Sequence, residues 1–218
     1  MSKTIIFDMD GTLIDSEKYY RIFWPKALAH FGYHMTDEQA LQMRSLGRPF
    51  APAKLKEWFG EELDYSTVRE YRKQIMEEFL LHNRMELKPG AVELLAWLKE
   101  KQFQVAVATA TDLERAERYL TQMGIRSYFT HVICAAMVKE GKPAPDIYQY
   151  ACRQLEQNPE DCIAVEDSPN GVMSAYRAGG KVIMVPDQTE PDELLSSIIH
   201  ARAECLTDLI PLLEDQYC

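Results

Sequence analysis

The sequence predicts an α/β protein in which a doubly wound parallel sheet is interrupted by inserted helices, and three observations indicate this. Short apolar strands alternate with helical patterns through the C-terminal half of the 218-residue chain. A further apolar strand near the N-terminus ends in acidic residues. The interval from Asp10 to Phe103 is far longer than a strand-to-strand crossover requires, so it must contain an insertion.

The first strand is predicted at residues 5–7, where an Ile-Ile-Phe run is typical of a strand buried on both faces. Gly11 allows the backbone to leave this strand sharply. Asp8 and Asp10 are two residues apart, so their side chains leave in the same direction while the chain stays extended. Two neighbouring carboxylates repel each other unless a cation or a shared proton lies between them. An ordinary Asp-Gly turn is the alternative explanation.

The remaining elements of the sheet follow in order along the chain. Apolar runs predict the strands and amphipathic stretches predict the helices that connect them. The predicted strands are residues 103–109, 131–136, 162–168 and 181–186, and the predicted helices are residues 89–98, 113–123, 145–155 and 171–178. This alternation is typical of a parallel sheet with helices on both faces.

The long insertion has helical patterns of its own. Residues 36–39 fit a capping box, and apolar side chains line one face of a helix at residues 68–80. Pro25 predicts a kink or a break within the first helical pattern.

The chain is therefore expected to have two parts. Residues 16–87 form a small helical domain, and residues 1–15 together with residues 88–218 form the core. An insertion that begins directly after an acidic pair is well placed to cover it, and its two linkers would act as hinges.

Polar side chains follow four of the predicted strands. In a doubly wound sheet the ligand binds beyond the carboxyl ends of the strands, so these side chains should meet. They are Asp8 and Asp10, Thr109-Ala110-Thr111, Gly141-Lys142-Pro143, and Glu166-Asp167-Ser168. Such carboxylates would hold a hard cation, and Mg²⁺ suits a small hydrated site better than Ca²⁺. Taken singly, these residues could equally be a sheet-end hydroxyl, a solvated lysine and a turn.

Composition restricts the partners of the protein. The net charge of -10 gives DNA and RNA no general attraction to the surface, so a small anionic substrate would need a locally positive site. No apolar run approaches a membrane span, and the first strand begins too early for a signal peptide. Five cysteines show no CxxC pair, which favours reduced thiols. We expect a cytoplasmic monomer or small homo-oligomer without a membrane or nucleic-acid partner.

Four segments match the motifs of one family, in the same order. They are DxDGT at residues 8–12, a strand-end threonine at Thr109, KPxPD at residues 142–146, and an acid pair at residues 166–167. The chain thus resembles the haloacid dehalogenase superfamily, in its phosphatase and β-phosphoglucomutase-like branch. The resemblance covers essentially the whole chain and implies a Rossmann-like core with a helical cap domain. The dehalogenases themselves lack the second aspartate, Asp10, so the resemblance favours a phosphatase.

The resemblance also implies a mechanism. Asp8 would attack phosphorus and form an aspartyl-phosphate, and Asp10 would protonate the leaving oxygen and then deprotonate water. Mg²⁺ would be held by Asp8, the backbone carbonyl of Asp10, and Asp167. Glu166 would order the water shell of the metal.

The same resemblance implies the phosphate-binding residues. Thr109, the backbone amide of Ala110 and Lys142 would bind the phosphoryl oxygens that the metal leaves free. Gly11 and Thr111 belong to the same loops and are expected to contact the phosphate.

The inserted helices are expected to select the substrate, a small phosphorylated metabolite such as a sugar phosphate. Ser16 and Tyr20 follow the first motif closely enough to face the site, and Arg44 and Arg48 are further candidates. Two arginines at such positions are more often solvated than functional.

Two other functions stay open on the sequence. One is a sugar-phosphate mutase with the same aspartyl-phosphate. The mutases usually place a histidine where this chain has Tyr20, whose ordinary pKa of about 10 makes it a poor proton acceptor. The other is a non-catalytic signalling module such as a receiver domain. Receiver domains carry their aspartate after a later strand and have no cap, which disfavours this alternative.

Overall fold

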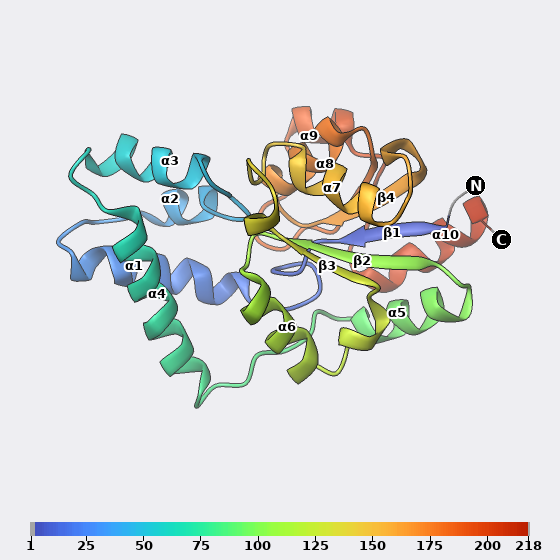
Figure 1. Ribbon diagram of the computed structural model, residues 1–218, viewed down its shortest axis with the longest axis horizontal. Coiled ribbons are helices and arrows are strands. Elements are labelled where there is room, and N and C mark those ends of the chain that lie inside the picture. Colours follow the sequence, from blue (N-terminus) through green and yellow to red (C-terminus); the bar gives the residue numbers. More distant parts are fainter. Residues whose placement is uncertain (1–2, 218) are drawn as a thin grey trace.

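The computed structural model describes residues 3–217 and confirms the predicted α/β fold. Six parallel strands form one sheet in the order β3-β2-β1-β4-β5-β6 (Figure 1). The strands are β1 (Thr4–Phe7), β2 (Gln104–Thr109), β3 (His131–Cys134), β4 (Cys162–Glu166), β5 (Lys181–Met184) and β6 (Ala201–Arg202). The first strand lies at the centre, between β2 and β4, so its acidic end meets the ends of both neighbours.

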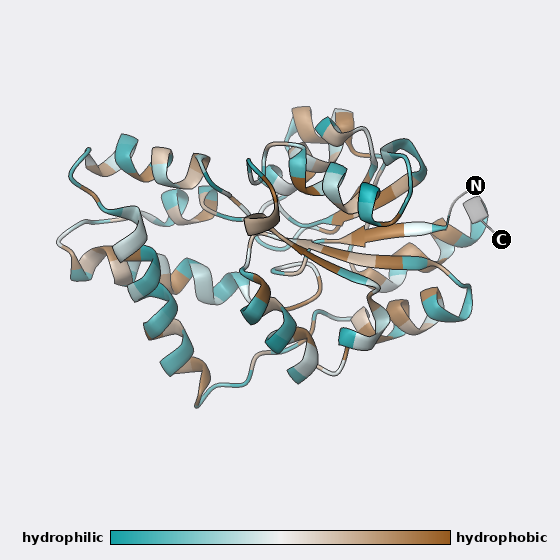
Figure 2. Cartoon of the chain, viewed as in Figure 1, coloured by the Kyte–Doolittle hydropathy of each residue, from teal (hydrophilic) through white to brown (hydrophobic). Residues whose placement is uncertain are grey.

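Helices cover both faces of the sheet, because successive strand side chains point to opposite faces and both sets are apolar. Helices α5 and α6 and the C-terminal α10 pack on the face of Ile5 and Phe7, and α7 to α9 pack on the face of Ile6. Figure 2 shows the strands as hydrophobic ribbons between these helices. The helices are α5 (Ala91–Glu100), α6 (Leu113–Gln122), α7 (Asp146–Gln154), α8 (Pro169–Ala178), α9 (Glu193–Ile198) and α10 (Leu209–Tyr217).

The insertion is helical, as predicted, and has its own apolar cluster, which includes Trp24, Leu28, Leu55 and Val68. In Figure 1 its helices lie to the left of the sheet, beyond the carboxyl end of β1. They are α1 (Glu17–His30), α2 (Asp37–Gln42), α3 (Phe50–Phe59) and α4 (Tyr65–Leu80). The capping box at the start of α2 is confirmed.

Three details differ from the sequence prediction. Helix α1 continues through Pro25 and packs along α4, so a break there is wrong, whereas a kink stays a prediction. The strands predicted at 131–136, 162–168 and 181–186 end earlier, at Cys134, Glu166 and Met184, because their last residues turn into loops at the sheet edge. Helices α3, α9 and α10 and strand β6 were not predicted. The exact boundaries between the helical domain and the core, after residue 15 and after residue 87, stay a prediction.

The described cysteines are free thiols, in agreement with the predicted reduced state; they are Cys134, Cys152, Cys162 and Cys205. Cys218 lies outside the described residues. Among the helices of residues 3–217, none combines the length and the apolar character needed to cross a bilayer.

Two glycines join the insertion to the core through their backbones. Gly47 donates its N–H to the carbonyl of Lys142 at 2.8 Å, and Gly141 donates to the carbonyl of Arg48 at 2.6 Å. A Cβ placed on Gly141 would lie 2.7 Å from the Cα of Gly47, and one on Gly47 would lie 2.6 Å from the Cα of Gly141. Only two residues without side chains allow this approach, because backbone atoms cannot move aside as a flexible side chain can.

We predict that Gly141→Ala lowers the free energy of unfolding by about 1–3 kcal/mol, because the new methyl group overlaps the facing backbone. Gly180→Ala is the matched control, since the nearest atom to its added Cβ is at 3.5 Å, an ordinary contact. Thermal and urea unfolding of both variants measures the difference. Equal stability of the two variants would show that the close approach does not constrain the fold.

Candidate active site

The register between β1 and β4 places Asp8 beside Glu166 and Asp167. Phe7 is paired with Val165, and Asp8 donates its N–H to the carbonyl of Val165 at 2.9 Å. Asp8 therefore lies next to Glu166, the last residue of β4, and Asp167 follows directly. The predicted meeting of these carboxylates at the sheet edge is found in the structure.

A buried lysine connects the two strands. The Nζ atom of Lys142 donates to Asp8 Oδ1 at 2.5 Å and to Glu166 Oε1 at 2.6 Å. Burial alone would lower the pKa of Lys142, but the two carboxylates outweigh burial and raise it. The hydroxyl of Tyr148 also donates to Glu166 Oε1, at 2.5 Å. A Cβ on Gly171 would lie 1.9 Å from Glu166 Oε2, so α8 leaves room for this carboxylate only because it has glycine there.

The carboxylates of Asp8, Glu166 and Asp167 form a candidate metal site. One oxygen from each lies within 4.8 Å of the others. Within the described part of the chain, Asp8 Oδ2 and Glu166 Oε2 are buried without a hydrogen-bond partner. Burial raises the pKa of Asp8 well above its ordinary value, and raises that of Asp167 to about 6 although Arg44 opposes this. Three buried carboxylates in a site with excess negative charge fit Mg²⁺, a hard cation that prefers oxygen ligands.

The carboxylate of Asp10 is directed toward hydroxyl groups instead of this cluster. Ser16 donates to Asp10 Oδ1 at 2.6 Å. Thr109 and Thr111 donate to Asp10 Oδ2 at 3.2 and 2.8 Å. Ser16, expected to contact substrate, is fully buried and instead holds Asp10 in place. The chain turns into α1 directly after the first motif, and this turn directs the Ser16 hydroxyl toward Asp10.

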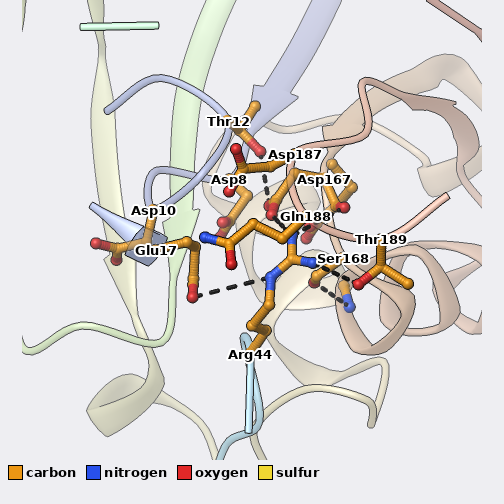
Figure 3. A network of polar contacts seen from close by, with 12 residues as sticks. Asp8, Asp10, Thr12, Glu17, Arg44, Asp167, Ser168, Asp187, Gln188 and Thr189 are labelled. Carbon is orange, nitrogen blue, oxygen red and sulfur yellow. Dashed lines mark hydrogen bonds and ion pairs between the residues drawn. The ribbon is translucent and has the colours of Figure 1, made fainter. Parts of the chain in front are cut away.

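An arginine of the insertion reaches the core acids. The guanidinium of Arg44 is paired with the carboxylate of Asp167, and it donates to Thr189 at 2.8 Å (Figure 3). Glu17 Oε2 lies 3.9 Å from Arg44 Nε, and both side chains are buried. Burial raises the pKa of Glu17 well above its ordinary value. Sequence reasoning missed Glu17, although an acid one residue after the predicted boundary of the insertion was a usable signal.

A cavity of about 240 Å³ opens above Asp8 and Asp10, between the sheet edge and the inserted helices. The predicted residues Tyr20, Arg44, Arg48, Ala110 and Thr111 line it, whereas Ser16, Thr109 and Lys142 do not.

Two of the predicted residues are placed by their immediate neighbours. The hydroxyl of Tyr20 lies 3.2 Å from Thr111 Oγ1. A Cβ on Gly11 would lie 2.5 Å from Asp167 Oδ2, so any side chain at this position would overlap the carboxylate of Asp167. The cavity also contains Arg69, Arg72 and Arg115, which sequence reasoning did not identify.

Comparison with known proteins agrees with this geometry. The family model for haloacid dehalogenase-like hydrolases matches residues 2–179. A probable pseudouridine-5'-phosphatase of Drosophila melanogaster is 33% identical over 94% of this chain and 90% of its own length. The mitochondrial (DL)-glycerol-3-phosphatase 1 of Arabidopsis thaliana is 34% identical over 92% and 72%, respectively.

Among solved structures, CbbY from Rhodobacter sphaeroides in complex with phosphate superposes with a TM-score of 0.80. It is 26% identical in sequence, and the match covers 96% of this chain and 97% of that one. The fold, the strand-end acids and these relatives agree with one another. The chain belongs to the haloacid dehalogenase-like hydrolases and is a phosphoric monoester hydrolase.

Proposed function

We propose that the protein is a Mg²⁺-dependent phosphatase that hydrolyses a small phosphorylated metabolite, such as a sugar phosphate, through an aspartyl-phosphate on Asp8. The observation that carries this proposal is the carboxylate of Asp8. One oxygen is fixed by Lys142, and the other is buried without a partner in the described structure, where the cavity reaches Asp8. A carboxylate held by one oxygen has the second available for attack on phosphorus.

In this mechanism Asp8 Oδ2 attacks phosphorus, the bond to the leaving oxygen breaks, and Asp10 gives that oxygen a proton. Asp10 then takes a proton from water as the water attacks the aspartyl-phosphate and frees Asp8. The hydrogen bonds from Ser16, Thr109 and Thr111 fix the orientation of Asp10 for both transfers.

Mg²⁺ would be held by Asp8, the backbone carbonyl of Asp10, and Asp167, with Glu166 ordering its water shell. When bound, it would neutralise negative charge on the phosphoryl oxygens. Lys142 would contribute positive charge at Asp8, and the Ala110 amide a hydrogen bond to a phosphoryl oxygen. The inserted helices would serve as a cap that excludes water and admits substrate when it opens.

Tyr20 favours hydrolysis over a mutase reaction. Burial raises the pKa of Tyr20, and its hydroxyl lies within hydrogen-bond distance of Thr111. Tyr20 therefore cannot accept and release a proton near neutral pH as a histidine at this position would. The relatives named as a pseudouridine-5'-phosphatase and a glycerol-3-phosphatase support a small phosphate ester as the substrate. We place the enzyme in the cytoplasm, where such esters and reduced thiols are found.

We predict that Asp8→Asn removes nearly all turnover while the protein stays folded, because the change keeps the shape of the side chain but not the nucleophile. Phosphate release from an aryl phosphate and circular dichroism measure the two effects. Asp161→Asn is the control, since Asp161 lies just before β4, at the end opposite the site. Turnover of Asp8→Asn within about tenfold of the parent would rule out catalysis through Asp8.

Asp10→Asn should lower kcat by about 10²–10⁴-fold on alkyl phosphates, whose leaving oxygen needs a proton. The deficit should be clearly smaller for an aryl phosphate with an acidic leaving group. Parallel kcat measurements on a series of leaving groups test this. The same deficit across the series would contradict the acid role of Asp10.

Removal of metal by chelation should stop turnover, and added Mg²⁺ should restore it, because the clustered carboxylates and a phosphate repel one another without a cation. Beryllium fluoride, a phosphoryl mimic, should bind in calorimetry only when Mg²⁺ is present, and should not bind Asp8→Asn. Full turnover by protein shown to be metal-free would refute the proposed site.

A further inference from the structure

The cavity above Asp8 has two chemically different parts. Three of its acidic side chains, Asp8, Asp10 and Glu17, belong to the end described above. Another part of the wall, formed by α4 and the start of α6, is basic. Among the described residues, this part of the wall has three arginines, Arg69, Arg72 and Arg115, and one acidic residue, Asp112.

Arg72 is buried without an opposite charge. It is 3% exposed, and no carboxylate of the described chain lies within ion-pair distance of it. Its Nε atom has no hydrogen-bond partner in the same set of residues. The guanidinium lies 4.7 Å from the ring centre of Tyr20 and 5.0 Å from that of Trp24. These rings hold the guanidinium in position, but they leave Nε–H without an acceptor.

The guanidinium of Arg115 also has N–H groups without hydrogen-bond acceptors in the described structure. It is 5% exposed, and its Nε and Nη1 atoms have no partner among residues 3–217. Its Nη2 atom lies 3.5 Å from Asp112, but Arg69 and Lys73 approach the same carboxylate oxygen at 4.0 and 3.4 Å. Arg69 and Lys73 are also paired with Glu70, at 3.2 and 2.9 Å. With Arg72 included, four cations face two carboxylates among the described residues, so this wall keeps a net positive charge.

Leaving buried donors unpaired is costly, and more so for a charged group. Burial lowers the pKa of Arg72, and the nearby charge of Arg115 acts in the same direction. Both arginines occupy helix faces that are otherwise apolar. Arg72 lies midway between the buried Val68 and Met76, and Arg115 lies one turn before the buried Tyr119. A ligand anion in the cavity would satisfy these donors.

We propose that Arg72 and Arg115 bind a second anionic group of the substrate, so that the preferred substrate is a small phosphate monoester carrying a further phosphate or a carboxylate. This inference rests on the proposed function, because it places the scissile phosphoryl group at Asp8. It also accounts for an anionic substrate on a protein of net charge -10, since the positive charge is concentrated inside the cavity.

The test compares matched ligands that differ by one anionic group. Isothermal titration calorimetry with Mg²⁺ present measures binding to Asp8→Asn, so that no turnover is needed. One pair is glucose 1-phosphate and glucose 1,6-bisphosphate, and the other is the open-chain pair glucitol 6-phosphate and 6-phosphogluconate. We expect the member with the second anionic group to bind about tenfold or more tightly in at least one pair. The pair that shows the preference distinguishes a phosphate from a carboxylate.

Added substitutions assign the preference to these arginines. In the Asp8→Asn background, Arg72→Gln and Arg115→Gln should each lose most of the preference. Arg118→Gln is the matched control, because Arg118 lies on α6 as well, but is exposed and paired with Glu77. If one variant fails to fold, as judged by its melting curve, the other carries the test. A general weakening of the fold would affect both members of a pair and leave their ratio unchanged.

Three results would overturn the inference: equal affinities within both pairs, a preference that survives both substitutions, or a preference that Arg118→Gln abolishes equally. Failure of the proposed function is a separate result. It would be seen as absence of phosphate release from an aryl phosphate by the parent protein, whatever the calorimetry gives.

Discussion

The buried contact of Lys142 with Asp8 and Glu166 is the interaction on which the site depends. It places one positive charge between carboxylates from two neighbouring strands, with the three side chains almost completely excluded from water. Removing one partner of such a buried pair costs about 3–5 kcal/mol, because an uncompensated charge is left behind. The lysine therefore fixes Asp8 in one orientation, and that orientation leaves its second oxygen without a partner.

The insertion is joined to this contact through the main chain. The carbonyl of Lys142 accepts a hydrogen bond from Gly47, and the neighbouring Gly141 donates to Arg48. Arg44, from the same stretch of the insertion, is paired with Asp167. The contacts between the insertion and the core thus reach Lys142, in the loop that follows β3, and Asp167, directly after β4.

The predictable part of this arrangement was the part fixed by topology. Apolar runs identify the central strands, and parallel strands bring their carboxyl ends together, so Asp8, Glu166 and Asp167 could be placed at one edge without knowing any contact. Side-chain direction could not be predicted in this way. Whether Ser16 faces the cavity or Asp10 depends on how the chain turns into α1.

The burial of Arg72 could not be predicted from the sequence either, because an arginine on an amphipathic helix is usually solvated. Its place in the apolar stripe of α4 becomes informative only when the aromatic rings of α1 are seen to enclose it. Short elements such as β6, with two residues, carry too little pattern to be recognised.

The stereochemical course of phosphoryl transfer tests the central claim most directly. A substrate whose transferred phosphoryl group is chiral through oxygen isotopes and sulfur is hydrolysed in labelled water, and the configuration of the released thiophosphate is determined. Transfer first to Asp8 and then to water inverts phosphorus at each step, so the account predicts overall retention. Retention does not depend on whether the aspartyl-phosphate accumulates. Overall inversion would mean that water attacks the substrate directly, and it would contradict the role assigned to Asp8.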